Sequence, residues 1–184
     1  MAIGIRVKRA PEEYDLGASK FFGAPTIPVS WGDEFDEDEI FFCQIRLSDI
    51  AHLDPENRLP HTGYLYIFLH TEGGEYDLSA DVRYLCGEPE MVVDDFNAEV
   101  LGYESFNGAY LMEFYECEDD ADCIRLLGAP SDWNYESEPN ELLLQYDPLD
   151  SDMGFLDFID GFLYFFFRDD ERNLDDAYLH EEFS

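Results

Sequence analysis

Residues 141–168, ELLLQYDPLDSDMGFLDFIDGFLYFFFR, contain two apolar runs that are separated by an acidic connection. The first run ends in Gln145, and the second is rich in Phe, Leu and Tyr. The same arrangement occurs earlier, where the run 41–45, which contains Gln44, is followed by a connection and the run 63–68. Short apolar runs between turn signals are typical of buried strands. The chain is therefore expected to be rich in β-structure and to repeat one pattern.

Four blocks of sequence recur in the same order in two segments, 18–70 and 123–168. Each segment has a basic residue, two apolar residues and Gly-Ala-Pro, as KFFGAP and RLLGAP. Each continues with a tryptophan, an acidic loop, an apolar run with one Gln, and a Gly-led aromatic run. Two such units packed about a pseudo-twofold axis would bury the sheet edges that one unit exposes. We therefore predict a single domain, residues 1–184, of the α+β class, mostly β, built from two pseudo-symmetric β-rich halves by internal duplication.

The helical part of this prediction consists of short segments with N-cap signals. Ser48 is suited to cap a short helix that follows it, and Asp119 or Asp120 to cap a helix at 121–127, because these side chains accept hydrogen bonds from free N–H groups. The acidic tail 169–184 is expected to be a short docked helix or a frayed end. The expected strands are 3–7, 41–47, 64–70, 82–86 and 91–93, with a hairpin between 100–103 and 109–115.

The charge of the chain is strongly unbalanced, with 44 acidic against 10 basic residues and a formal net charge of −34. Disordered acidic proteins are poor in aromatic residues, so an aromatic content of 16% indicates that this chain folds. Nucleic acids and anionic membranes are disfavoured as partners, because both need Lys and Arg to displace their counterions. The acidity serves solubility, adaptation to high salt, or binding of a basic protein.

The cysteines and the N-terminus indicate a reducing compartment. None of the four cysteines forms a C-x-x-C pair, and the first residues lack the apolar core of a signal peptide. No stretch reaches the roughly 18 apolar residues that a transmembrane helix needs. We therefore expect reduced thiols and a cytoplasmic location.

The sequence has no recognisable catalytic motif. It lacks G-x-S-x-G and both glycine-rich phosphate motifs, and its four histidines are too far apart for zinc-ligand spacing. Asp147-x-x-Asp150-x-Asp152-x-Gly154 resembles a calcium loop, but it lacks the ligands required at positions five and twelve. We therefore predict no cofactor and no metal centre, with at most weak divalent binding to acidic patches.

Two glutamines interrupt otherwise apolar runs and are the basis of a candidate ligand site. A buried amide needs hydrogen-bond partners, so Gln44 and Gln145 either tie neighbouring loops to the sheet or form one site where the halves meet. The tryptophans and the first carboxylate after Gln145 are expected nearby. The candidate ligand-binding residues are Trp31, Gln44, Trp133, Gln145 and Asp147.

These blocks resemble the YwqG-like family of bacterial proteins of unknown function. The first-half blocks are KFFGAP, FFCQIRL and LPHTGYLYIF, and the second-half blocks are LLGAP, LLLQYD and GFLYFFF. The resemblance spans about residues 18–168 and implies a compact mixed α/β or mostly β fold, without an established reaction. One departure is FLDFID at 155–160, where the family usually has an aromatic-Gly-Asp turn.

Two functional hypotheses follow. The first is a non-catalytic interaction module, regulatory or toxin-neutralising, whose acidic surface binds a basic protein partner; complementary charges would then steer association. The second is an enzyme or a small-ligand-binding protein with a pocket at the junction of the two halves. We favour the first, since no catalytic motif is present.

Overall fold

The structure is a computed structural model that describes residues 1–32, 34–35, 39–71, 78–94, 96, 108–131, 140–148, 161–168 and 171–183. Within these ranges the chain forms strands and short 3-10 turns, with no α-helix. The strands are β1 (Ala2–Arg9), β2 (Lys20–Phe21), β3 (Thr26–Ile27), β4 (Glu39–Arg46), β5 (Tyr64–Thr71), β6 (Leu78–Leu85), β7 (Met91–Val92), β8 (Tyr110–Cys117), β9 (Arg125–Leu126), β10 (Leu142–Tyr146), β11 (Gly161–Phe166) and β12 (Tyr178–Phe183). The 3-10 turns are η1 (Val29–Trp31), η2 (Leu47–Asp49), η3 (Ala51–Leu53) and η5 (Leu174–Asp176).

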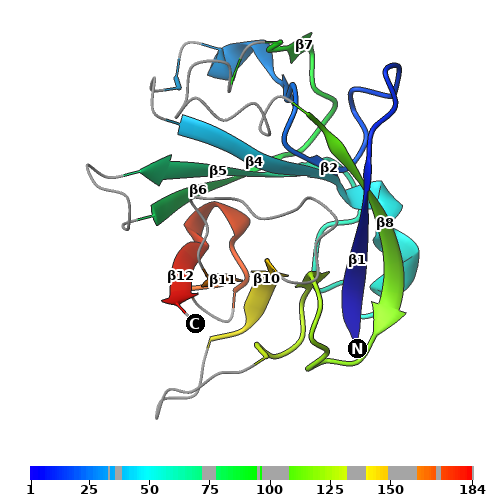
Figure 1. Ribbon diagram of the computed structural model, residues 1–184, viewed down its shortest axis with the longest axis vertical. Coiled ribbons are helices and arrows are strands. Elements are labelled where there is room, and N and C mark those ends of the chain that lie inside the picture. The colour runs from blue at the N-terminus through cyan, green and yellow to red at the C-terminus, as the bar shows by residue number, and fades with distance from the viewer. Residues whose placement is uncertain are drawn as a thin grey trace.

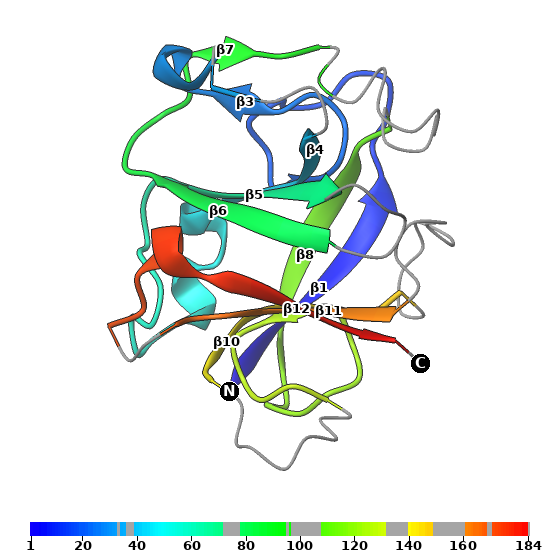
Figure 2. The same cartoon turned by 90° about the vertical axis from the view of Figure 1, so that its left-hand side faces the viewer.

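Ten of these strands form one antiparallel sheet in the order β12-β11-β10-β9-β1-β8-β2-β4-β5-β6. The sheet curls until its edge strands β6 and β12 pack together, which gives a nearly closed barrel. In Figure 1, β4, β5 and β6 lie in the upper part and β10, β11 and β12 in the lower part, with β1 and β8 running alongside both. Figure 2 shows the small sheet of β3 and β7 above the barrel.

The predicted α+β class is wrong, although the expectation of a mostly β chain agrees with the structure. The segment after Ser48 forms only the turns η2 and η3, because Asp54 precedes a proline and a residue in that position disfavours helical backbone. The helix expected at 121–127 is replaced by β9, whose two residues pair with both β1 and β10. The C-terminal tail contributes the edge strand β12, which pairs with β11 along its whole length.

The long apolar strands expected from the sequence are present, and one arm of the expected hairpin is described. The strands predicted at 3–7, 41–47 and 64–70 correspond to β1, β4 and β5. β8 pairs with β1, from Ala2 opposite Cys117 to Arg9 opposite Tyr110. The other arm of the predicted hairpin, 100–103, lies outside the described residues.

The strand order reads the same from either edge of the sheet toward its centre. Counted inward from one edge, the strands are β6, β5, β4, β2 and β8. Counted inward from the other edge, their counterparts are β12, β11, β10, β9 and β1. The pairing registers also correspond, since Lys20 lies opposite Gln44 and Arg125 lies opposite Gln145. This is the topology that two copies of one unit would produce, with the pair β1–β8 between them.

Local irregularities also recur at matching places. β4 has a β-bulge between Phe41 and Cys43, and β10 has one between Leu142 and Leu144. The short strands β2 and β9 are each followed by an apolar residue with positive φ, Phe22 or Leu127, and then by Gly23 (φ 75°) or Gly128 (φ 91°). Glycine is needed there, because L side chains rarely adopt this backbone conformation. The Gly-Ala-Pro blocks of the sequence therefore encode a left-handed turn that ends each strand.

The core has three parts. The barrel interior is filled by alternate side chains of the strands, including Phe42. The ring centroids of Tyr146 and Phe165 lie 5.4 Å and 5.9 Å from that of Phe42. A second cluster covers the outer face of β4 and β5 and includes Phe41, Tyr66 and Phe68. A third covers the outer face of β10 and β11. Because both faces of β5 and β11 are buried, these strands read as continuous apolar runs.

Candidate functional site

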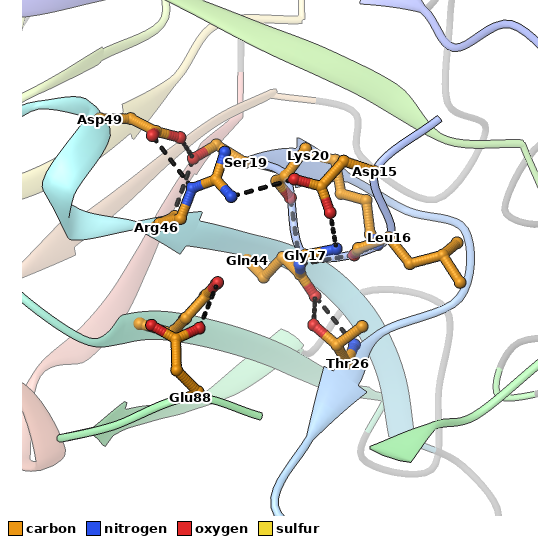
Figure 3. A network of polar contacts seen from close by, with 12 residues as sticks. Asp15, Leu16, Gly17, Ser19, Lys20, Thr26, Gln44, Arg46, Asp49 and Glu88 are labelled. Atoms are coloured by element: carbon orange, nitrogen blue, oxygen red, sulfur yellow. Dashed lines mark hydrogen bonds and ion pairs between the residues drawn. The ribbon is translucent and has the colours of Figure 1, made fainter. Parts of the chain in front are cut away.

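Gln44 on β4 is fully buried and uses both ends of its amide (Figure 3). Its Oε1 accepts hydrogen bonds from the Thr26 backbone N–H at 3.0 Å and from the Thr26 hydroxyl at 3.3 Å. Its Nε2 donates to the carbonyl oxygens of Leu16 and Ala18, both at 3.0 Å. The amide thus has two acceptor and two donor contacts, which is its full capacity, and it fixes the segment 16–26 against the sheet.

Gln145 on β10 makes the corresponding contacts in the second half. Its Oε1 accepts from the Ser131 backbone N–H at 2.9 Å, and its Nε2 donates to the Cys123 carbonyl at 3.2 Å and the Ser131 hydroxyl at 2.7 Å. Cys123 and Ser131 follow Ala18 and Thr26 by 105 residues in the sequence. The same backbone atoms are therefore held by an amide in each half.

The structure does not bring the two glutamines into one site. β4 and β10 are separated in the sheet by β2, β8, β1 and β9, and the described contacts of each glutamine are with its own half. Their geometry is that of two separate ties between a loop and a strand.

The other candidate residues are also dispersed. Trp31 in η1 packs edge-on against Tyr66 at 5.3 Å between ring centroids, and Tyr66 is the neighbour of Gln44 across the strands. Asp147 is buried directly after β10. Trp133 lies outside the described residues.

Beside each glutamine lies a buried cation. Lys20 and Arg125 are both completely buried, and each donates to backbone carbonyls of its own loop, namely Leu16 for Lys20 and Ala121 and Ala129 for Arg125. Burial lowers the pKa of Lys20 to about 8, although the nearby Asp15 carboxylate opposes the shift. Burial also lowers the pKa of Arg125, but arginine keeps its charge in proteins.

A pocket of about 470 Å³ lies where the two halves meet. One wall is the segment 57–61, between η3 and β5, and the other is the segment 171–172, between β11 and η5. Arg58, His61 and Arg172 line it, so three nitrogen-bearing side chains converge in a protein of net charge −34. The lining residues are not those expected from the sequence.

Asp54 fixes one wall of this pocket. Its buried carboxylate accepts a hydrogen bond from the Leu59 backbone N–H at 2.9 Å, and it lies 3.3 Å from His61 Nε2 and 3.6 Å from Arg58 Nε. Burial acts to raise the pKa of Asp54, but the hydrogen bonds and the Arg58 charge hold it below its usual value. The carboxylate therefore stays ionised and orients two of the lining side chains.

A strongly acidic surface lies at the end of β8 and in the turn that leads to β9. We name residues 116–122 the acidic turn, because they carry five exposed carboxylates, on Glu116, Glu118, Asp119, Asp120 and Asp122. Figure 1 shows β8 ending beside the N-terminus, and the amino group of Met1 lies 2.7 Å from Asp119 Oδ1. One cation against five carboxylates leaves this turn with a large excess of negative charge.

Most described basic groups are already committed elsewhere. Arg46, Arg58, Arg83, Arg168 and Arg172 each lie within 4 Å of a carboxylate. The buried Lys20 and Arg125 add nothing to the surface. The remaining bases lie on the exposed face of β1, at Arg6, Lys8 and Arg9. Folding therefore leaves the acidic excess largely uncompensated.

Sequence reasoning missed the side chains that come together only through strand pairing and loop packing. Among the described residues, Glu39, His70 and Asp81 place donor atoms within 4.8 Å of one another, which is a grouping able to hold a metal ion. These residues lie on three strands, far apart in the sequence. The pairing register of β4, β5 and β6 is the feature that identifies them as neighbours.

The described residues contain no helix that is long and apolar enough to cross a membrane. The chain matches no protein-family model, and no curated protein matches it. The resemblance to the YwqG-like family therefore stays a prediction based on the sequence blocks.

Proposed function

We propose that the protein is a non-catalytic interaction module that binds a basic protein through its acidic surface, with the acidic turn at the centre of contact. The observation that supports this proposal is how the positive charges are used. Two are buried and five are paired with carboxylates, so the exposed carboxylates of the turn have few internal partners. Such an uncompensated field speeds association with a basic partner and weakens as salt is added.

The test is a capture experiment at low and high salt with charge-neutralised variants. The variant Glu118→Gln/Asp120→Asn/Asp122→Asn removes three exposed carboxylates of the turn, and the control Glu12→Gln/Glu13→Gln/Asp94→Asn removes three exposed carboxylates elsewhere. We expect the first variant to lose a basic partner that the wild type and the control bind at low salt. Equal binding by both variants, or no salt-sensitive basic partner, would contradict the proposal and leave acidity as a solubility device.

A second candidate is a small anionic ligand in the pocket between the halves. What favours it is the convergence of Arg58, His61 and Arg172, since arginine side chains bind carboxylates and phosphates in bidentate geometry. The test is a thermal-shift series with phosphate and small dicarboxylates. Stabilisation that is lost in Arg172→Gln would support this function, and no shift in the wild type would exclude these anions.

The proposal also includes a cytoplasmic location and membership of the YwqG-like family. The four cysteines are free in the structure, and two of them are buried. Free thiols suit a reducing compartment. The family assignment is supported by the recurrence of its sequence blocks on matched strands.

A further inference from the structure

We propose that Glu39, His70 and Asp81 form a binding site for a divalent transition-metal ion. The three residues lie on the adjacent strands β4, β5 and β6. Glu39 is directly opposite His70 in the register, and Asp81 is opposite Phe68, two residues before His70 on the same face. This arrangement brings one nitrogen and two carboxylate donors within 4.8 Å of one another.

Glu39 is the buried ligand of the proposed site. Its side chain is only 2% exposed, and its Oε1 lies 3.3 Å from His70 Nε2. Buried carboxylates are either paired or bound to a metal, because an isolated buried charge is costly. The side chains of His70 and Asp81 are 26% and 36% exposed, so an ion would reach the site from solvent and keep some of its water.

The donor set indicates the class of metal. Imidazole suits zinc, iron, nickel and copper, whereas magnesium and calcium prefer ligands that are all oxygen. Donors bound to one zinc ion at about 2.0–2.2 Å lie roughly 3–3.5 Å apart. The Glu39–His70 pair is already at 3.3 Å, and rotation of the partly exposed Asp81 side chain completes the site. Three protein ligands leave room for one or more waters.

Arg83 is the competing charge next to the site. Its Nε lies 2.6 Å from Asp81 Oδ2 and its Nη1 lies 3.3 Å from Glu34. Its guanidinium also stacks on Phe35, 4.8 Å from the ring centroid. Arg83 therefore holds one oxygen of Asp81 and leaves the other for the ion. We expect the Arg83→Gln variant to bind metal more tightly, because a positive charge is removed from the neighbourhood.

The second half provides a natural comparison. The Leu142–Phe166 pair lies beside the β10 bulge as the Phe41–Phe68 pair lies beside the β4 bulge. Glu39 lies two residues before Phe41, and its counterpart before Leu142 is Asn140. His70 lies two residues after Phe68, and its counterpart after Phe166 is Arg168. The counterpart of Asp81, which is opposite Phe68, is Tyr178, which is opposite Phe166. Asn140 Nδ2 donates to the Tyr178 hydroxyl at 3.1 Å, and Arg168 stacks on that ring at 5.2 Å.

The equivalent place thus has a fixed cation and an amide instead of metal ligands. An antiparallel sheet of this geometry does not itself require the first-half trio, since the second half closes with other residues. At these matched positions, only the first half has a group of metal-ligating side chains. The proposed metal site is independent of the acidic surface proposed for partner binding.

The experiment is a titration of the full chain with Zn²⁺ by calorimetry, in about 0.15 M salt with excess Mg²⁺, so that weak binding to the acidic surface is suppressed. Co²⁺ is titrated in parallel, because its visible spectrum reports nitrogen and oxygen coordination. We expect one saturable site, weakened at least about tenfold in Glu39→Gln, His70→Asn and Asp81→Asn. Glu113→Gln, an exposed carboxylate on β8, is the matched control and is expected to bind like the wild type.

Two results would overturn the proposal. One is Zn²⁺ binding that Mg²⁺ displaces or that the three ligand variants leave unchanged. The other is equal weakening by Glu113→Gln, which would assign binding to the overall charge. Circular dichroism checks that each variant is folded, and the partly exposed His70 and Asp81 decide the question if Glu39→Gln does not fold.

Discussion

The two halves of the barrel hold their loops with corresponding contacts, which a glutamine makes in both halves and a lysine or an arginine adds. In the first half Gln44 and Lys20 bind the segment 16–26, and in the second Gln145 and Arg125 bind the segment that ends at Ser131. Conserved between the halves are the buried backbone groups that need partners. The buried cation differs, but Lys20 and Arg125 both donate to backbone carbonyls, so the fold constrains the contact more than the residue that makes it.

The residues after the two glutamines behave differently. Arg46, just before η2, is partly exposed and has the buried Asp147 as its counterpart, and these residues carry opposite charges. Arg46 pairs with Asp15 and Asp49, both at 3.0 Å (Figure 3). The four predictions below compare buried groups that recur in both halves with Arg46, which is partly exposed and does not recur.

The largest effect is expected from replacing the glutamines. Gln44→Leu leaves the Thr26 N–H and two carbonyls without partners, and each such buried group costs about 1–3 kcal/mol. We expect the free energy of unfolding to fall by about 4 kcal/mol in Gln44→Leu and by about 3 kcal/mol in Gln145→Leu. Urea denaturation measures both. A loss below about 1 kcal/mol in either variant would show that the loop does not depend on the amide.

A smaller loss is expected at the turn glycines. A Cβ at Gly128 would lie 2.4 Å from the Asp119 carbonyl oxygen, while one at Gly23 would lie 2.8 Å from the Ala109 Cβ, and both have positive φ. We expect Gly128→Ala to cost about 3 kcal/mol and Gly23→Ala about 2 kcal/mol, because backbone strain adds to the clash. Thermal denaturation ranks them. Gly32, with φ of −59°, is the control, and an equal cost for Gly32→Ala would refute the conformational explanation.

The two buried cations are expected to affect the pH dependence of stability differently. Because the pKa of Lys20 is lowered to about 8 from its ordinary 10.5, the unfolded chain binds the proton that the folded chain has already lost between these values. The free energy of unfolding therefore rises with pH across this window, by about 3 kcal/mol. Lys20→Arg introduces the second half's cation and should remove this rise. Identical pH profiles for wild type and variant would show that Lys20 is not desolvated.

The smallest effect is expected for Arg46→Gln. Arg46 is 34% exposed, and exposed ion pairs contribute less than about 1 kcal/mol. The Arg46 hydrogen bond and the Gly17 backbone lower the pKa of Asp15, so the contribution is present above the unfolded value of 3.8 and is lost as pH falls below it and through the lower folded value. Urea denaturation at low and high salt should show a difference only at low salt. A large loss of stability at high salt would show that the Arg46 contacts behave like those of a buried group.

The sequence was sufficient for the strands that are apolar on both faces, and insufficient for the edge strand β12 and for the connections. β4, β5 and β11 are apolar on both faces, so their runs identify them without help. The two-residue strands β2 and β9 have no periodicity, because their role is set by the neighbours on either side. Residues 121–127 have a helix-like cap signal, but Arg125 and Leu126 are drawn into the sheet by β1 and β10.

The candidate site shows the same limit. Burial of Gln44 and Gln145 followed from their place in apolar runs, and the need for hydrogen-bond partners followed from burial. Their partners did not follow, since Leu16 and Cys123 are reached only after the loops fold back. The cluster of Glu39, His70 and Asp81 depends on strand register, which the sequence does not specify. The common origin of the halves stays a prediction, while the correspondence of their contacts is observed.

The central pair β1–β8 joins segments that are far apart in the sequence. The partners of β1 are residues 110–117 and 125–126, so β1 has no strand neighbour until these later residues have left the ribosome. At about 5–20 residues per second this delay lasts on the order of ten seconds. Arg6, Lys8 and Arg9 discourage pairing of the waiting strand with other chains, as charged residues do at exposed edges. Pairing over such long sequence separation also makes slow folding the expectation for the isolated protein.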